Sequence, residues 1–134
     1  MTPEPEWLLA SAILTIHSML IAAHGGTEGV RDPGLLDSAL TRPKNLLAYA
    51  DQPPSLFELA ASYAFGLVKN HCFLDGNKRI ALTAALTFLD LNGYRLEAPQ
   101  PETYSMMIGL ATGDVTEPAF SAWLAAHCER IAAD

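Results

Sequence analysis

Apolar residues recur along most of the chain at intervals of three and four positions, which is the spacing of one face of an α-helix. The first stripe predicts a helix that the Gly25-Gly26 pair ends. Its members are Leu9, Ile13, Ile16 and Leu20. No segment shows the sustained alternation of apolar and polar residues that marks a sheet. The pattern therefore predicts an all-α fold, a compact bundle of about six helices.

Two proline positions decide how the second helix is predicted. Asp32 offers a side-chain cap and Pro33 suits the first turn, so the pair predicts a helix start. Because proline lacks an amide hydrogen, Pro43 is expected to interrupt this helix. The segment from Pro43 to Pro54 is then the most loop-like part of the chain, with room for one helical turn.

Capping patterns predict the remaining helices. Ser55 and Glu58 form a capping box for the third helix, and a fourth is predicted from about Asn77 to Asn92-Gly93. A short extended piece, a fifth helix and a last helix follow, at Tyr94–Leu96, at Pro101–Ala111 and after a Thr116 cap. The residues expected to face inward on the last helix are Phe120, Trp123, Leu124, His127 and Ile131.

Composition excludes several classes of protein. The chain has 134 residues, 50% of them hydrophobic, and a formal net charge of -7. This length predicts a single domain over residues 1–134. Polar residues interrupt every apolar stretch before the roughly 20 residues of a membrane span, so no membrane association is expected. The acidic balance also argues against direct binding of nucleic acid.

The N-terminus and the cysteines indicate the cellular compartment. Met1–Glu6 is acidic and proline-containing, unlike the basic start of a signal peptide, so a cytoplasmic location is expected. Cys72 and Cys128 lack the paired spacing of a disulfide framework or zinc site. One bridge between them is possible, but two reduced thiols are favoured.

Three of the eight cations, Lys69, Lys78 and Arg79, lie within eleven residues of one another and flank His71. The segment between them joins the end of one predicted helix to the start of the next. Free amides at that start, the helix dipole and the cations would together bind an anion. Gly76 would let a phosphate approach the backbone closely.

Two further residues of this segment suit group transfer. Asp75 is suited to hold Mg²⁺ between its carboxylate and phosphate oxygens, and His71 is suited to take a proton from a hydroxyl. These are parts that phosphoryl or nucleotidyl transfer requires. Two alternatives stay open: Asp75-Gly76 as a hairpin turn, which the helical flanks disfavour, and Asp75 as an ordinary cap beside solvated cations. Catalytic zinc is not expected, because no third ligand lies nearby.

At this point the sequence resembles a known family. The segment His71-x-Phe73-x-Asp75-Gly76-Asn77-Lys78-Arg79 resembles the Fic/Doc signature, His-x-Phe-x-Asp/Glu-Gly-Asn-x-Arg, and Lys78 resembles the Doc (death-on-curing) branch. Other segments similar to Doc-type chains are His24–Gly26, Gly29–Gly34, Leu36–Leu40 and Ala111–Gly113. The resemblance implies the Fic/Doc bundle, with the active-site loop between two central helices.

The family also implies an activity. Fic proteins transfer the AMP part of ATP to a target hydroxyl, whereas Doc toxins transfer the terminal phosphoryl group, with elongation factor Tu as the known target. For this chain the resemblance implies the toxin of a type II toxin–antitoxin system, a kinase that uses ATP and Mg²⁺ to arrest translation. A cognate antitoxin segment would fill its groove. AMP transfer and a non-catalytic helical binding module remain alternatives.

The signature assigns a role to each of its residues. The implied roles are His71 as general base, Asp75 as Mg²⁺ ligand, Asn77 and Arg79 as phosphate ligands, Gly76 as backbone anion cradle and Phe73 as anchor. Lys78 stands where AMP-transferring members carry a second glycine, and Leu82 stands where they carry a second arginine. Both departures favour kinase chemistry, and Lys69 is expected to supply part of the missing charge.

Other reactive side chains are interpreted as structural. His17 and His127 lie on or beside apolar stripes and are expected to be packed and hydrogen-bonded. His24 is interpreted as a helix-end residue, with lining the site as the alternative. Cys72 has no partner that would activate it as a nucleophile. The Pro43–Pro54 segment is either a plain connection or a target-docking flap, as the equivalent region is in Fic proteins.

Overall fold

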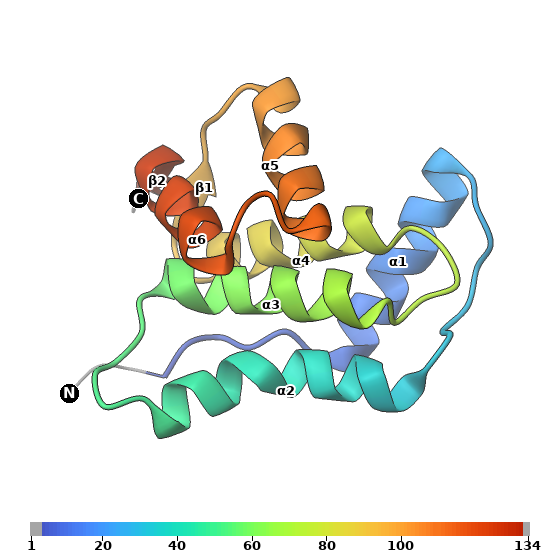
Figure 1. The fold of residues 1–134 in the computed structure, drawn as a ribbon, viewed down its shortest axis with the longest axis horizontal. Helices are drawn as coiled ribbons and strands as arrows, with labels where there is room; N and C mark the ends of the chain where they lie inside the picture. Colours follow the sequence, from blue (N-terminus) through green and yellow to red (C-terminus); the bar gives the residue numbers. More distant parts are fainter. Residues whose placement is uncertain (1–3, 133–134) are drawn as a thin grey trace.

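A computed structural model describes residues 4–132, and within them six α-helices pack together with one small antiparallel sheet (Figure 1). The helices are α1 (Ala10–His24), α2 (Pro33–Tyr49), α3 (Leu56–Asn70), α4 (Asn77–Leu91), α5 (Gln100–Thr112) and α6 (Glu117–His127). The strands are β1 (Tyr94–Leu96) and β2 (Cys128–Arg130). The predicted helical bundle is confirmed. Met1–Pro3 of the N-terminal segment, and residues 133–134 of the predicted domain, lie outside the described residues.

The centre of the bundle is α3, which packs on α2, α4 and α6 (Figure 1). Its side chains are buried over most of its circumference, including Tyr63 and Leu67, which are fully enclosed. A Cβ added at Gly66 would lie 3.3 Å from the Cα of Ala39, so the close approach of α2 depends on this glycine. The two helices that carry the ends of the signature loop, α3 and α4, are therefore fixed by the core on both sides.

The predicted starts of α2, α3 and α6 are confirmed, whereas α1 begins only at Ala10 and leaves Leu9 of the predicted stripe outside the helix and exposed. The Asp32 carboxylate accepts from the Leu35 amide at 3.0 Å, and the Thr116 hydroxyl accepts from the Ala119 amide at 3.1 Å. Both bonds of the capping box at Ser55 are present. These side chains accept from amides that have no acceptor within their own helix. Because cap and amide are three residues apart, the caps can be predicted from a short stretch of sequence.

The predicted interruption at Pro43 is wrong, because α2 continues through it from Pro33 to Tyr49. A proline inside a helix removes one hydrogen bond, here the bond to the carbonyl of Ala39. Pro43 is buried in the bundle, and packing of this face offsets the lost bond. The connection to α3 is correspondingly short, at residues 50–55.

The predicted last helix extends too far, since α6 ends at His127 and Ile131 lies beyond β2. The chain instead pairs with β1: the Glu97 amide donates to the His127 carbonyl, and the Ile131 amide donates to the Gly93 carbonyl, both at 2.8 Å. Three residues are too few for an alternating pattern to show in the sequence.

Two smaller predictions can also be checked in the described residues. Cys72 and Cys128 are both free, which confirms the two reduced thiols. None of the helices within residues 4–132 is long and apolar enough to cross a membrane.

Candidate active site

The signature loop, defined here as residues 71–76, joins α3 to α4 at one end of the bundle (Figure 1). The segment between α1 and α2 runs beside it, and its Gly29 carbonyl accepts from the Leu74 amide at 3.0 Å. A pocket of about 800 Å³ opens between this loop and α5. One wall carries the polar signature residues, and the other carries Tyr104, Met107 and Ile108 of α5.

His71 ends α3 in a left-handed conformation, with φ 51° and ψ 55°. It is the one non-glycine residue with positive φ among residues 4–132. This conformation costs an L-residue roughly 1–2 kcal/mol. The side chain is exposed and lines the pocket, so its direction is set by the main chain and by few contacts.

Asn77 supplies one of those contacts. Its Oδ1 accepts from the Phe73 amide and its Nδ2 donates to the Phe73 carbonyl, both at 3.0 Å. These two bonds fix the orientation of the amide group, because the Phe73 N–H can donate only to its oxygen and the Phe73 carbonyl can accept only from its nitrogen. The same Nδ2 lies 3.1 Å from Nδ1 of His71. Nδ1 therefore accepts, and Nε2 is the ring nitrogen left for a ligand in the pocket.

The start of α4 forms an anion-binding site. The first hydrogen bond of the helix runs from the Ile80 amide to the Gly76 carbonyl at 3.0 Å, so the three preceding amides have no acceptor in the helix. Those amides belong to Asn77, Lys78 and Arg79. The side chains of Lys78 and Arg79 are exposed and line the same pocket, which adds two full charges to the helix dipole.

Two predicted phosphate-site residues lie differently from the others. Asn77 is 7% exposed and its side chain holds the loop, so its free group is the main-chain amide. Lys69 does not line the pocket; its ammonium donates to the Ala111 carbonyl at 3.0 Å. The structure thus brings the rest of the signature together and leaves Lys69 beside the C-terminal end of α5.

Gly76 is required by the backbone as well as by any ligand. It has φ 74°, and an added Cβ would lie 3.2 Å from Cδ1 of Ile21. A side chain here would therefore strain the backbone and crowd Ile21 of α1, even with no phosphate bound.

Asp75 is held as an ionised carboxylate at the mouth of the pocket. Its Oδ2 accepts from the Thr27 amide at 3.2 Å, and its Oδ1 accepts from the Gly76 amide at 2.9 Å. The bond from Thr27, and then that from Gly76, lower the pKa of the Asp75 carboxyl below its ordinary value. Because Gly26 has no side chain, the carboxylate can lie against it; an added Cβ would be 2.7 Å from Oδ2.

The donor set suits a magnesium nucleotide better than a protein-bound metal. No cluster of three or more His, Cys, Asp or Glu side chains that could hold an ion occurs within residues 4–132. One exposed, ionised carboxylate beside free amides fits Mg²⁺, which keeps waters and shares phosphate oxygens as ligands.

Phe73 and Cys72 are buried inside the loop. Phe73 is 1% exposed and its main chain pairs with Val30 of the segment between α1 and α2. Burying such a side chain stabilises the loop by about 1.5–3 kcal/mol. Burial also raises the pKa of the Cys72 thiol, so the group is protonated at neutral pH and unsuited to be a nucleophile.

His17 of α1 has a place behind the loop that the sequence did not indicate. It is 2% exposed, its ring stacks on Phe73 at 3.8 Å between centroids, and its Nε2 donates to the Asp75 carbonyl at 2.8 Å. The expectation of a packed, hydrogen-bonded histidine is confirmed. Its partner is a main-chain carbonyl of the signature loop, and no sequence pattern identifies such a pairing.

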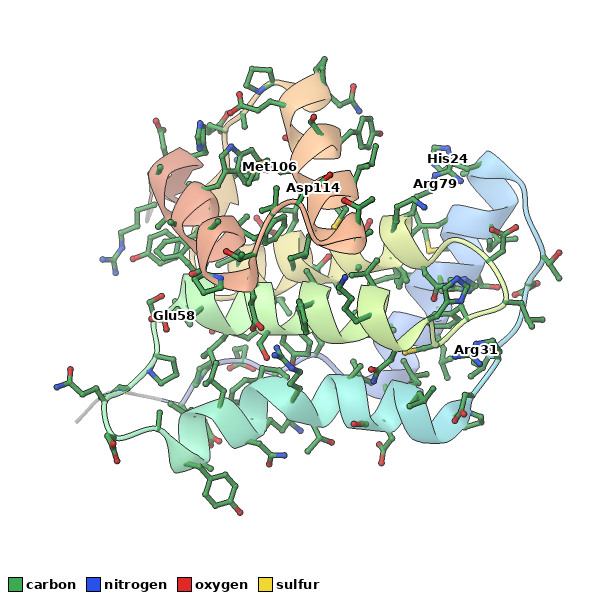
Figure 2. All side chains as sticks on the ribbon, viewed as in Figure 1. His24, Arg31, Glu58, Arg79, Met106 and Asp114 are labelled. Carbon is green, nitrogen blue, oxygen red and sulfur yellow. The ribbon has the colours of Figure 1, made fainter. Side chains whose placement is uncertain are left out.

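The other two histidines differ in their position relative to the pocket. His127 is half-buried, and its Nδ1 donates to the Trp123 carbonyl at 2.8 Å, as expected for a structural residue. His24 is exposed and lines the pocket, at the same end of the molecule as Arg79 (Figure 2).

Comparison with known proteins gives this site a family. Residues 7–89 match the family model described as Fic/DOC family. The chain is 35% identical over 113 residues, 84% of each chain, to "Protein kinase doc" of Escherichia phage P1. It is 44% identical over 93 residues, 69% of each chain, to "Toxin Doc" of Mycolicibacterium smegmatis. The signature loop and these matches agree, and the chain belongs to the Fic/Doc family.

Proposed function

We propose that this protein is the toxin of a type II toxin–antitoxin pair and acts in the cytoplasm as a protein kinase. Its proposed substrate is a hydroxyl group on a translation factor similar to elongation factor Tu. One observation carries the proposal: an exposed imidazole, an ionised carboxylate and a cationic helix start line a single pocket. The names of the two relatives, a protein kinase and a toxin, support it.

The residues divide the chemistry between them. The amides at the start of α4, with Lys78 and Arg79, bind the phosphates of ATP and stabilise charge on the transferred group. Asp75 would hold Mg²⁺, which when bound neutralises phosphate oxygens. The acceptor hydroxyl oxygen bonds to the γ-phosphorus as the bond to the β–γ bridging oxygen breaks and ADP leaves. His71 takes the hydroxyl proton at Nε2.

The protonation of His71 adds a requirement. While Nδ1 accepts from Asn77, the neutral ring carries its hydrogen on Nε2, which then has no free lone pair. The Asn77 contact must therefore change before Nε2 can act as a base. Phosphate binding by the Asn77 side chain, which the family signature implies, would supply that change, and it requires the bonds of this side chain to Phe73 to rearrange as well.

Lys78 and Leu82 favour phosphoryl transfer over AMP transfer. Both line the pocket, where AMP-transferring members would present a glycine and a second arginine. A lysine side chain fills space that nucleotide phosphates would otherwise occupy, and an apolar Leu82 offers them no charge. The nucleotidyltransferase is therefore the second candidate.

The direct test is transfer of label to elongation factor Tu from ATP labelled at the γ-phosphate or at the α-phosphate. We expect label from the γ-position alone. Label from the α-position would replace the kinase by the nucleotidyltransferase.

His71→Ala should lose both transfer and growth arrest, with His127→Ala, a histidine outside the pocket, as the matched control. Growth arrest that survives His71→Ala would indicate the binding module instead.

The α5 wall of the pocket is the proposed site for the antitoxin. Tyr104 and Ile108 are about half exposed beside the cationic loop, so an amphipathic acidic segment could cover both walls. Co-expression of the small gene next to this one should relieve growth arrest. Relief that persists after Tyr104→Ser with Ile108→Ser would place the antitoxin elsewhere.

A further inference from the structure

Arg31, in the segment between α1 and α2, donates hydrogen bonds to three consecutive main-chain carbonyls in the turn that ends α3. The Arg31 guanidinium donates from Nη2 to the Asn70 carbonyl at 2.9 Å and from Nε to the His71 carbonyl at 2.6 Å. The main-chain amide of Arg31 donates to the Cys72 carbonyl at 2.8 Å. Figure 2 shows Arg31 beside this turn.

We propose that Arg31 is a positioning residue for His71, which it holds in the left-handed conformation that aims the imidazole into the pocket. This inference rests on the proposed function, because it assigns importance to the direction of that ring. Arg31 does not line the pocket, so it acts through the main chain and not on a ligand.

The geometry explains why an arginine is needed. Nε and one Nη of a guanidinium are parallel donors in one plane, which matches two successive carbonyls, whereas a lysine ammonium is a single point. The C-terminal end of α3 also carries partial negative charge that a cation stabilises. Both effects favour the turn over a continued helix, in which His71 would return to negative φ.

The exposure of His71 makes this support consequential. A buried ring would be held by its neighbours, but the His71 ring is exposed and its described polar contact is the one from Asn77. Its direction therefore follows the main chain. A shift of the reacting nitrogen by about 1 Å can lower a rate about 100-fold.

The experiment compares Arg31→Met and Arg31→Lys with Arg95→Met. Arg95 lies on β1 outside the pocket, 62% exposed and 3.8 Å from Asp90, so its removal changes the net charge equally without touching the turn. We expect Arg31→Met to lower kcat for phosphoryl transfer by about 10- to 100-fold, with KM for ATP changed less than about twofold. Arg31→Lys should recover part of the loss, and Arg95→Met should match the wild type.

A second readout uses the protein alone. Positive φ gives a strong nuclear Overhauser effect between the amide and Hα protons of the same residue, and His71 should show it in the wild type and in Arg95→Met. Arg31→Met should weaken it. An Arg31→Met protein that keeps both this signal and the wild-type kcat overturns the inference, as does a loss confined to KM.

The two readouts separate this inference from the proposed function. Absence of phosphoryl transfer by the wild type would refute the kinase, while the Overhauser measurement would still decide the role of Arg31. Should Arg31→Met fail to fold, Arg31→Lys decides: a wild-type kcat in a folded Arg31→Lys protein would contradict the need for a planar pair of donors.

Discussion

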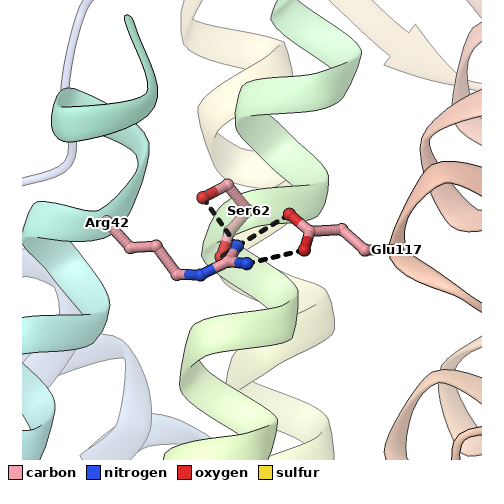
Figure 3. Close-up of polar contacts among 3 residues, drawn as sticks. All are labelled: Arg42, Ser62 and Glu117. Carbon is pink, nitrogen blue, oxygen red and sulfur yellow. Dashed lines mark hydrogen bonds and ion pairs between the residues drawn. The ribbon is translucent and has the colours of Figure 1, made fainter. Parts of the chain in front are cut away.

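Two arginines join neighbouring segments to α3, and their partners differ in kind. Arg42 of α2 makes a bidentate pair with the Glu117 carboxylate of α6, at 2.7 Å for each bond, and donates to the Ser62 hydroxyl at 2.9 Å (Figure 3). Within residues 4–132, the Arg31 guanidinium donates to two main-chain carbonyls of the turn that carries His71 and to no side chain. The Arg42 region, defined here as Arg42, Ser62 and Glu117, links regular helices. The Arg31 region, which comprises Arg31 and the turn at residues 70–72, maintains an unfavourable backbone conformation beside a pocket.

The difference separates stability from activity. Contacts in the Arg42 region hold three helices that also share an apolar core, so their loss lowers the free energy of unfolding without moving the pocket. Contacts in the signature loop maintain a strained residue and an exposed carboxylate, so their loss changes the geometry of the site.

The largest effect is expected from His71→Gly. Loss of the base should lower phosphoryl transfer by about 10²- to 10⁴-fold. Because glycine adopts positive φ freely, the same change should raise the free energy of unfolding by about 0.5–1 kcal/mol, net of the greater entropy of the unfolded chain. Transfer assays and urea denaturation measure the two quantities.

His71→Ala is the matched control for this prediction. It removes the same imidazole but keeps the cost of a left-handed residue, so activity should fall equally with no gain in stability. Equal stability of the glycine and alanine variants would show that the turn is not strained.

Gly26→Ala should have the next largest effect. The new Cβ would lie 2.7 Å from Oδ2 of Asp75 and would displace the carboxylate. We therefore expect the rate of transfer to fall by about 10- to 100-fold and the Mg²⁺ concentration needed for half-maximal rate to rise. Gly25→Ala is the control, since Gly25 also has positive φ, at 83°, but open space around it. A Gly25→Ala protein as impaired as Gly26→Ala would mean that backbone strain, and not the carboxylate, is responsible.

These cases show what the sequence could and could not predict. The helices and caps were predictable because periodicity and capping act within a few residues, and the signature could be found because its members are contiguous. Arg31 and His17 could not be assigned, because their partners are main-chain carbonyls brought close by tertiary packing. Pro43 was mispredicted because its burial depends on neighbours far along the chain.

A smaller effect, on stability alone, is expected from Arg42→Met. The pair with Glu117 is partly exposed and therefore screened, so its loss should lower the free energy of unfolding by about 1–2 kcal/mol. The transfer rate per folded molecule should stay at the wild-type value. Arg95→Met, which removes a longer and more exposed contact, should leave stability within about 0.5 kcal/mol. A large fall in kcat for Arg42→Met would erase the distinction between the two arginines.

The smallest expected change is the position of one hydrogen on His71. In the Arg42 region the polar groups can keep their partners throughout a reaction, but the contact between Asn77 and His71 cannot, because a base at Nε2 needs its hydrogen on Nδ1. Ring ¹⁵N spectra of the wild type should show the Nε2–H form without ligand and the Nδ1–H form with a non-hydrolysable ATP analogue and Mg²⁺. A ring that keeps its hydrogen on Nε2 in the ligand complex would remove His71 as the general base and leave it as a hydrogen-bond donor to the transferred group.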